Sequence, residues 1–391
     1  MATEDDLEEY EKRIQLATVA TDAFAAQLFE ELDTKNGGFW WWKDHLDWKR
    51  RVLIADYLIA SVHGVSAALM GACLAADEYR ANAAADGSAL HEALEGVRTS
   101  TAQSKGIHEF AAAVPRDSAA RRRGRMMTFS AEHCLFHLGQ VLDRLAAVIV
   151  IVGGFGREDI TGASWNWING LAVELGLVDT RPAAKLKKDK RKPASKLVTT
   201  ELVQPPASPG RDAQTTLIEA VLSAADHGPE EWLKWTRETR NAMAHRPPIR
   251  VLNSVTSDGL TGLLFRNPRW TDIQALAFAE QPADEPMSGV LLLKSNADVL
   301  DGLCDSMNSY LSAIMRSVSE CWSTRKAHPM LIIQPAAQWP NHKPPGFPSR
   351  FPGYGDDAKP VEGSVVLTHP NEGRRWQSAR VFDHMKHQWR E

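Results

Sequence analysis

The chain contains 391 residues, of which 43% are hydrophobic and 24% are charged, and its formal net charge is -4 at pH 7. This composition is typical of a soluble globular protein and gives no sign of a general polyanion-binding surface, so any nucleic-acid contact must be local. Four cysteines without a CxxC pair argue against a zinc knuckle and a secreted disulfide scaffold. The acidic start of the chain is unlike a signal peptide, and the longest apolar run, residues 145–152, is shorter than a membrane span. We therefore expect a cytoplasmic protein with no membrane segment.

Helices are predicted in succession through the first half of the chain, because apolar residues recur there at helical spacing without proline. These helices cover residues 7–32, 51–76, 129–152 and 165–175. Turn-forming residues 33–38 end the first helix. The tryptophan-rich segment Phe39 to Trp42, followed by Trp48, offers rings on which bases could stack, but such rings more often anchor helix packing, and we favour packing.

The second half of the chain is less regular. Residues 181–213 are rich in lysine and proline, and we interpret them as a mobile basic insertion. Helices follow at residues 214–225, 229–245 and 296–322, the last capped by Asn296, and short strands are predicted at residues 249–252, 262–265 and 289–293. After Pro329 the chain is rich in proline, glycine and aromatic residues, which favours extended structure.

These elements predict a mostly all-α fold with a few short strands near residues 249–293. We expect three regions along the chain. They are an N-terminal helical region at residues 1–125, a helical domain at 126–325 and a C-terminal tail at 326–391.

The helix at residues 229–245 is the strongest candidate for a functional site. At about 100° per residue, Trp232, Trp235, Thr236, Thr239 and Met243 fall on one stripe, which we expect to be buried. Arg237, Asn241 and His245 step by four along the opposite stripe. Arg240 precedes His245 by five positions, so on an ideal helix their side chains point about 140° apart.

The string RNAMAH, Arg240 to His245, resembles the Arg-x4-6-His motif of the HEPN superfamily, in which Asn, Asp or His often follows the arginine, as Asn241 does here. The resemblance implies a HEPN-like helical bundle within residues 126–325. It also implies a metal-independent endoribonuclease of the toxin or anti-phage abortive-infection type, with Arg240, Asn241 and His245 as catalytic residues. In HEPN toxins silenced by a nucleotidyltransferase antitoxin, the tyrosine that the antitoxin modifies lies two residues after the histidine. Pro247 stands there in this chain, so that route of regulation is not expected.

The chemistry fits these residue types. Metal-free RNA cleavage needs deprotonation of a 2′-hydroxyl, stabilisation of a charged phosphorane and protonation of the leaving oxygen. Histidine titrates near neutral pH, and arginine can bind two phosphate oxygens at once. Because His245 is one proton-transfer group where two are needed, we expect a homodimer in which two motifs share a groove. The expected partners are RNA, either tRNA or mRNA, and an antitoxin or regulatory protein; no cofactor is expected.

Other residues are weaker candidates for a functional site. Arg237 and Arg246 could bind flanking phosphates and Glu238 could orient His245, although solvated surface roles are the simpler interpretation. His133 and His137 have a spacing that zinc enzymes use, but no third ligand is evident and a packing role is favoured. The alternatives to a ribonuclease are a catalytically silent HEPN-like RNA-binding or nucleotide-binding subunit and a helical scaffold.

Overall fold

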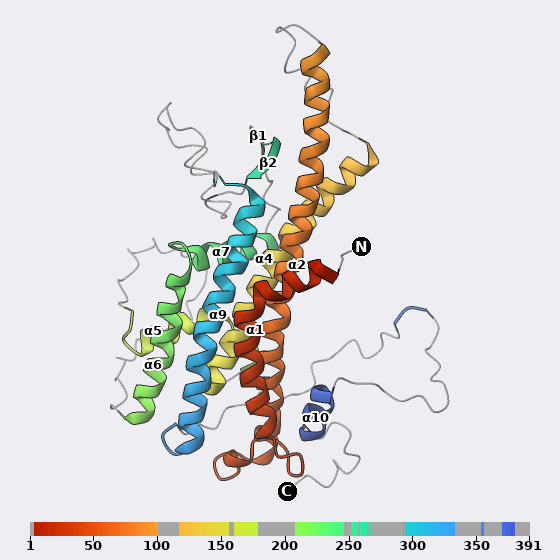
Figure 1. Cartoon of the computed structure of the whole chain (residues 1–391). Helices are drawn as coiled ribbons and strands as arrows, with labels where there is room; N and C mark the ends of the chain where they lie inside the picture. Colours follow the sequence, from red (N-terminus) through yellow and green to blue (C-terminus); the bar gives the residue numbers. More distant parts are fainter. Residues whose placement is uncertain are drawn as a thin grey trace, which may run out of the picture. The chain divides into compact units, whose positions relative to one another are not determined.

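The computed structural model describes residues 4–100, 117–155, 160–178, 208–245, 252–256, 259–263, 266, 292, 294–332, 353–355 and 370–379. Across this part of the chain the fold is all-α with one β-hairpin (Figure 1). The long helices are α1 (Glu4–Glu30), α2 (Trp48–Ser100), α4 (Ser118–Val152) and α9 (Asn296–Ala327). The shorter helices are η1 (Trp40–Trp42), η2 (Ile160–Gly162), α5 (Trp165–Glu174), α6 (Pro209–Ser223), η3 (Ala224–His227), α7 (Trp232–His245) and α10 (Pro370–Ser378).

The chain divides into two compact units, each made of three segments. The first unit comprises Met1–Ala20, Gly64–Leu142 and Leu222–Ile314. The second unit comprises Thr21–His63, Asp143–Val221 and Met315–Glu391. This division differs from the three consecutive regions expected from the sequence, whose boundaries after residues 125 and 325 fall inside α4 and α9. Long helices pass from one unit to the other, so packing and not chain order defines the units.

Several helix ends differ from the sequence prediction because polar side chains decide where a helix starts. α4 begins eleven residues before the predicted residue 129, since the Asp117 carboxylate accepts a hydrogen bond from the Ala120 amide at 2.7 Å. Ser295, and not Asn296, caps α9: its hydroxyl accepts a bond from the Asp298 amide and donates one to the Asp298 carboxylate at 2.6 Å. The bond from the Asp298 amide to the Ser295 hydroxyl is a side-chain N-cap.

Other elements also differ from the sequence prediction. α2 continues to Ser100 instead of ending near residue 76, because the intervening residues are mostly good helix formers. Residues 209–213, expected within the mobile insertion, form the start of α6, and residues 181–207 of that insertion lie outside the described residues. The tail contains the helix α10, where extended structure was expected. β1 (Leu252–Thr256) and β2 (Gly259–Leu263) form a hairpin with Thr256 opposite Gly259, where strands were predicted at residues 249–252 and 262–265. The strand predicted at residues 289–293 lies, apart from Leu292, outside the described residues.

An aromatic cluster forms the core of the second unit and confirms the packing role of the tryptophan-rich segment. Trp41, Trp42 and Phe39 are buried and make edge-to-face contacts with Trp322, at centroid distances of 5.0, 5.4 and 4.9 Å. The buried Glu31 carboxylate accepts bonds from the indole nitrogens of Trp41 and Trp322 at 3.1 and 3.0 Å. A buried carboxylate is tolerated because donors surround it.

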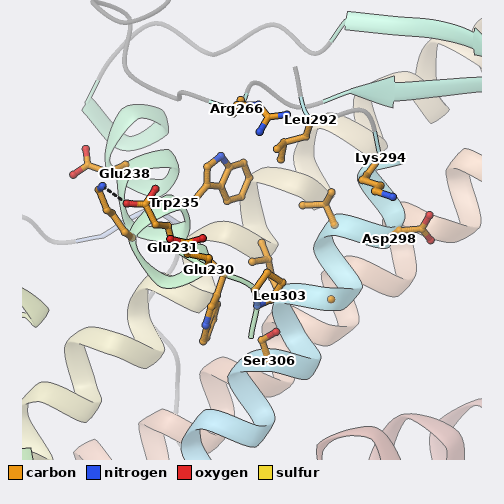
Figure 2. Close-up of a pocket in the computed structure, with 15 residues that line it drawn as sticks. Glu230, Glu231, Trp235, Glu238, Arg266, Leu292, Lys294, Asp298, Leu303 and Ser306 are labelled. Carbon is orange, nitrogen blue, oxygen red and sulfur yellow. Dashed lines mark hydrogen bonds and ion pairs between the residues drawn. The ribbon is translucent and has the colours of Figure 1, made fainter. Parts of the chain in front are cut away.

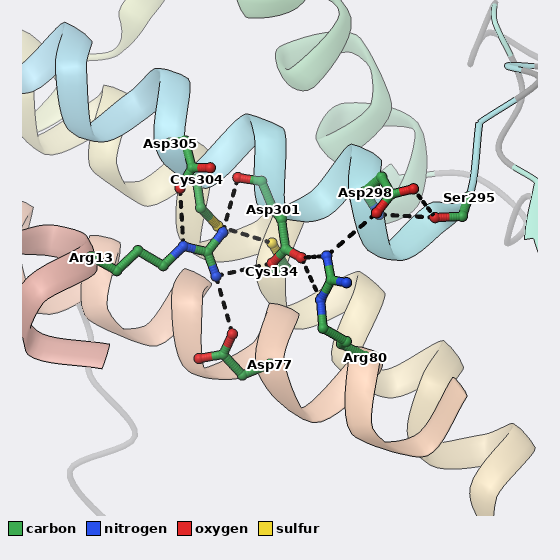
Figure 3. A network of polar contacts seen from close by, with 9 residues as sticks. All are labelled: Arg13, Asp77, Arg80, Cys134, Ser295, Asp298, Asp301, Cys304 and Asp305. Atoms are coloured by element: carbon green, nitrogen blue, oxygen red, sulfur yellow. Dashed lines mark hydrogen bonds and ion pairs between the residues drawn. The ribbon is translucent and has the colours of Figure 1, made fainter. Parts of the chain in front are cut away.

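A network of ion pairs joins helices of the first unit (Figure 3). Arg13 of α1 contacts Asp77 of α2 at 3.0 Å, and Asp301 and Asp305 of α9 at 2.9 and 3.0 Å. Arg80 of α2 reaches Asp301 with its Nε at 2.7 Å. Beneath this network the thiols of Cys134 and Cys304 lie 3.9 Å apart. All four cysteines are free and buried, which agrees with the interpretation of reduced core thiols.

Two helical stretches, Arg50–Ala89 and Ser118–Val152, are long and apolar enough to cross a membrane by length and composition. In the fold, 50% and 72% of their most apolar windows are buried inside the protein. Core helices of globular proteins meet the same criterion, so this is weak evidence for a membrane protein.

Candidate functional site

The helix α7 carries the motif and is held by a buried stripe. Trp232, Thr236, Thr239 and Ala242 are buried, whereas Trp235 and Met243, which were predicted on this stripe, are half-buried. The Trp232 indole donates to the Ala225 carbonyl at 2.8 Å and makes an edge-to-face contact with Tyr310 of α9 at 5.8 Å. The amphipathic pattern thus gave the correct side of the helix, and packing selected the smaller Ala242 at its far end.

Arg240 lies directly against the backbone of α4. A β-carbon placed on Gly139 would lie 2.7 Å from the Nε atom of Arg240 and 2.8 Å from its Cγ atom. Such distances are too short for a carbon contact, so only glycine at position 139 leaves room for the arginine in this place. The glycine lowers the helix propensity of α4 by about 1 kcal/mol relative to alanine, and in exchange it seats Arg240 beside this helix.

A pocket of about 290 Å³ opens where these two helices meet. The walls from α4 are Glu132, His133 and Phe136, and the walls from α7 are Arg240, Met243 and Ala244. The His133 ring packs on the Phe129 ring at a centroid distance of 3.9 Å. The centroids of the His133 and His137 rings are 5.9 Å apart. The pocket therefore combines a guanidinium, an imidazole and a carboxylate with an apolar rim.

The predicted catalytic residues are placed as follows. The Nη1 atom of Arg240 donates to the Asn241 side-chain carbonyl at 3.0 Å, so these two residues are brought together. Asn241 was expected to contact phosphate or orient an imidazole; in the structure it orients Arg240. His245 is the last residue of α7, and its side chain lies outside the described part of the chain.

The predicted auxiliary residues do not gather at the same place. Arg237 is half-buried on α7, and Arg246 lies outside the described residues. Glu238 lines a different, larger pocket together with Trp235, so it is not brought to the pocket of Arg240. On a helix, two positions of separation turn the side chain by about 200°, which explains the division.

Sequence reasoning missed His133 and Glu132 as neighbours of the motif. Their spacing with His137 was considered only for zinc, and no group of three or more potential metal ligands occurs among the described residues. The contact joins residues more than one hundred positions apart, which no local periodicity encodes. The available signal was Gly139, a glycine within a strongly apolar helix, which marks a close approach of another element.

The arrangement has a definite chemical capacity. A guanidinium presents a planar fork of donors that matches the oxygens of a phosphate. An imidazole in the same pocket is a group that can act as a general acid or base. The pocket formed by Arg240, His133 and Glu132 is thus suited to binding a phosphodiester and moving a proton at it.

No protein-family model, curated protein or solved structure matches this chain.

Proposed function

We propose that the protein is a metal-independent endoribonuclease of the HEPN type that cleaves RNA through its own 2′-hydroxyl and acts as a toxin or an anti-phage defence effector in the cytoplasm. The observation that supports this proposal best is the seating of Arg240 against Gly139, in a pocket that also contains His133. An arginine can stabilise the charged phosphorane, and an imidazole can perform one of the two proton transfers of metal-free phosphodiester cleavage.

In the proposed reaction, Arg240 binds the non-bridging oxygens of the scissile phosphate and stabilises the extra negative charge of the phosphorane. One imidazole removes the proton of the 2′-hydroxyl, whose oxygen attacks phosphorus. A second imidazole donates a proton to the 5′-oxygen as its bond to phosphorus breaks. The products are a 2′,3′-cyclic phosphate and a free 5′-hydroxyl. Asn241 holds the guanidinium through its bond to Nη1.

His245 supplies one of the two imidazoles in this proposal, and the second imidazole has two candidate sources. One is His245 of a second chain in a symmetric dimer, as expected from the sequence. The other is His133 of the same chain, which lines the pocket of Arg240. We favour His133 together with His245, because His133 already lies on this pocket without a second chain. The homodimer remains a separate proposal, and RNA and a regulatory antitoxin remain the proposed partners.

Cleavage of labelled tRNA and mRNA by the purified full chain in EDTA tests the proposal. We expect Arg240→Ala and His245→Ala each to slow cleavage by about 100-fold or more, and His133→Ala to slow it by a similar factor. The matched control is His328→Ala, which removes an exposed imidazole at the end of α9 and should leave the rate unchanged. Mass spectrometry of the products should find 2′,3′-cyclic phosphate ends.

Each contrary result has a specific meaning. Unchanged cleavage by His245→Ala contradicts the catalytic assignment. Unchanged cleavage by His133→Ala alone assigns the second imidazole to a partner chain. RNA binding that depends on Arg240 without any cleavage or growth arrest would indicate a silent RNA-binding subunit, and absence of both would leave the helical scaffold.

A further inference from the structure

The N-terminal half of α7 lines a second and larger pocket in the first unit (Figure 2). Its volume is about 750 Å³, and its other walls come from the start of α9 and from residues 266, 292 and 294. Pockets that enclose small ligands usually measure about 300–1,000 Å³. The size therefore suits a mononucleotide, and no step of the proposed RNA cleavage uses this pocket.

One surface of this pocket is aromatic and apolar. The Trp235 indole projects from α7 toward Arg266 and Leu292, and Leu303 of α9 lies across the pocket (Figure 2). Trp235 is half-buried, so its ring reaches the cavity instead of the core. An indole face at the edge of an apolar pocket is a surface on which a nucleobase can stack.

A second wall is acidic and is presented by a distorted segment before α7. Among the described residues, Glu231 is the only non-glycine residue with a positive φ, which is 60°. This conformation delays the start of the helix to Trp232, past the predicted Pro229, and turns Glu230 and Glu231 onto the pocket. Glu238, two turns further along α7, adds a third carboxylate on the same side (Figure 2).

Two carboxylates of the pocket interact with other side chains of the protein. Glu231 pairs with Lys234 at 2.6 Å, and Asp298 accepts bonds from Ser295 at 2.6 Å and Arg80 at 3.4 Å. These two groups serve the protein's own structure. Glu230 is the acceptor that we assign to a ligand.

Basic groups lie away from the acidic α7 wall. Arg266 lies beyond the Trp235 ring, and Lys294 is an exposed residue just before α9 (Figure 2). A guanidinium and an ammonium at one pocket provide charge-assisted bonds to a phosphate. The pocket thus offers acceptors, a stacking ring and anion-binding groups in one cavity.

We propose that this pocket binds a guanine nucleotide. The base stacks on Trp235, the phosphate contacts Lys294 and Arg266, and the carboxylate of Glu230 accepts bonds from the base edge. Guanine fits best because its ring N–H and its amino group are adjacent donors, and an ionised carboxylate only accepts. Adenine and cytosine lack this donor pair, and uracil has a single ring donor flanked by acceptors.

Isothermal titration calorimetry of the full chain with GMP tests the proposal, with AMP, guanosine and inorganic phosphate as comparison ligands. GMP should bind one to one, and each comparison ligand should bind about tenfold more weakly or worse. Trp235→Ala should raise the Kd for GMP by about tenfold, the usual cost of a lost stacking ring, while Trp235→Phe retains part of the affinity. The matched control is Trp40→Ala, which removes a tryptophan that is 50% exposed outside this pocket.

The exposed Lys294 provides a variant that does not disturb the core. Lys294→Glu should weaken GMP about fivefold or more but leave guanosine unchanged, because only the nucleotide carries the phosphate. The proposal is overturned by absence of GMP binding at millimolar concentration, or by unchanged GMP affinity in both Trp235→Ala and Lys294→Glu. AMP binding as tightly as GMP overturns the choice of guanine, and phosphate binding as tightly overturns the base site. None of these measurements depends on RNA cleavage. Nucleotide binding is therefore tested independently of the proposed ribonuclease function.

Discussion

Arg240 lies against Gly139 in α4 and Arg325 lies against Gly154 just after α4, yet the surroundings of the two arginines differ. Arg325, in the second unit, is 1% exposed and donates to the carbonyls of Ile151 and Val152 at 2.8 and 2.5 Å. Its guanidinium also lies 5.8 Å from the Trp41 ring centroid. Arg240, in the first unit, is half-buried and lines a pocket with ionisable side chains.

The difference separates a structural arginine from a candidate functional one. Arg325 donates to two carbonyls in the last turn of α4, one of which also accepts a bond from the Gly154 amide, so its donors serve the fold. Burial lowers its pKa to about 10, which records the cost of keeping a cation there. Arg240 is steered by Asn241 toward a cavity instead. The surroundings, and not the residue type, decide which role an arginine can take.

The largest effect should come from Arg325→Ala. The change removes the charged donor from the Ile151 and Val152 carbonyls, which keep only the Gly154 amide and the Cys321 thiol as donors among the described residues, and it removes the cation from the aromatic cluster. We therefore expect a loss of about 3 kcal/mol or more in the free energy of unfolding. Urea denaturation followed by circular dichroism measures it. Arg240→Ala should lose less than about 1 kcal/mol. Equal losses in the two variants would erase the distinction between the arginines.

A smaller and more selective effect should come from Gly139→Ala. The new methyl group collides with Arg240, whose flexible side chain moves away, while α4 gains about 1 kcal/mol of helix propensity. We expect normal stability with RNA cleavage lowered by about tenfold or more, because a small misplacement of a catalytic group is costly. Gly124→Ala is the control in the same helix, because a β-carbon there meets no atom within 4 Å. Full activity of Gly139→Ala would show that the seat of Arg240 is unimportant.

The smallest effect is expected at Cys321, which lies near Arg325. This effect should be measurable only at alkaline pH. Burial raises the pKa of this thiol to about 11, above its ordinary value of 9.0. The folded protein therefore keeps a proton that the unfolded chain releases, so the stabilisation is complete below pH 9 and falls as the pH rises toward 11. Between pH 9 and 10, the stability of Cys321→Ala should fall less steeply than that of the wild type in urea titrations. Identical slopes would contradict the assigned shift.

Much of the fold could be predicted from local patterns. The helices near residues 7–32 and 165–175 and the amphipathic side of α7 follow from periodicity and turn residues, which act over a few positions. The starts of α4 and α7 were misplaced because they depend on the Asp117 cap and on the distorted Glu231, whereas the start of α9 was predicted correctly and only its cap was assigned one residue too late. The division into two units was missed because the long helices serve both.

The sequence by itself determined an all-α protein, a tryptophan-rich segment suited to packing and an Arg-Asn pair near the end of an amphipathic helix. Those features depend on spacing along one chain segment. Only the tertiary structure decided that Gly139 seats Arg240, that His133 shares its pocket and that Glu238 belongs to a different cavity. These are contacts between distant segments, or between opposite faces of one helix, and packing alone fixes which side chains meet.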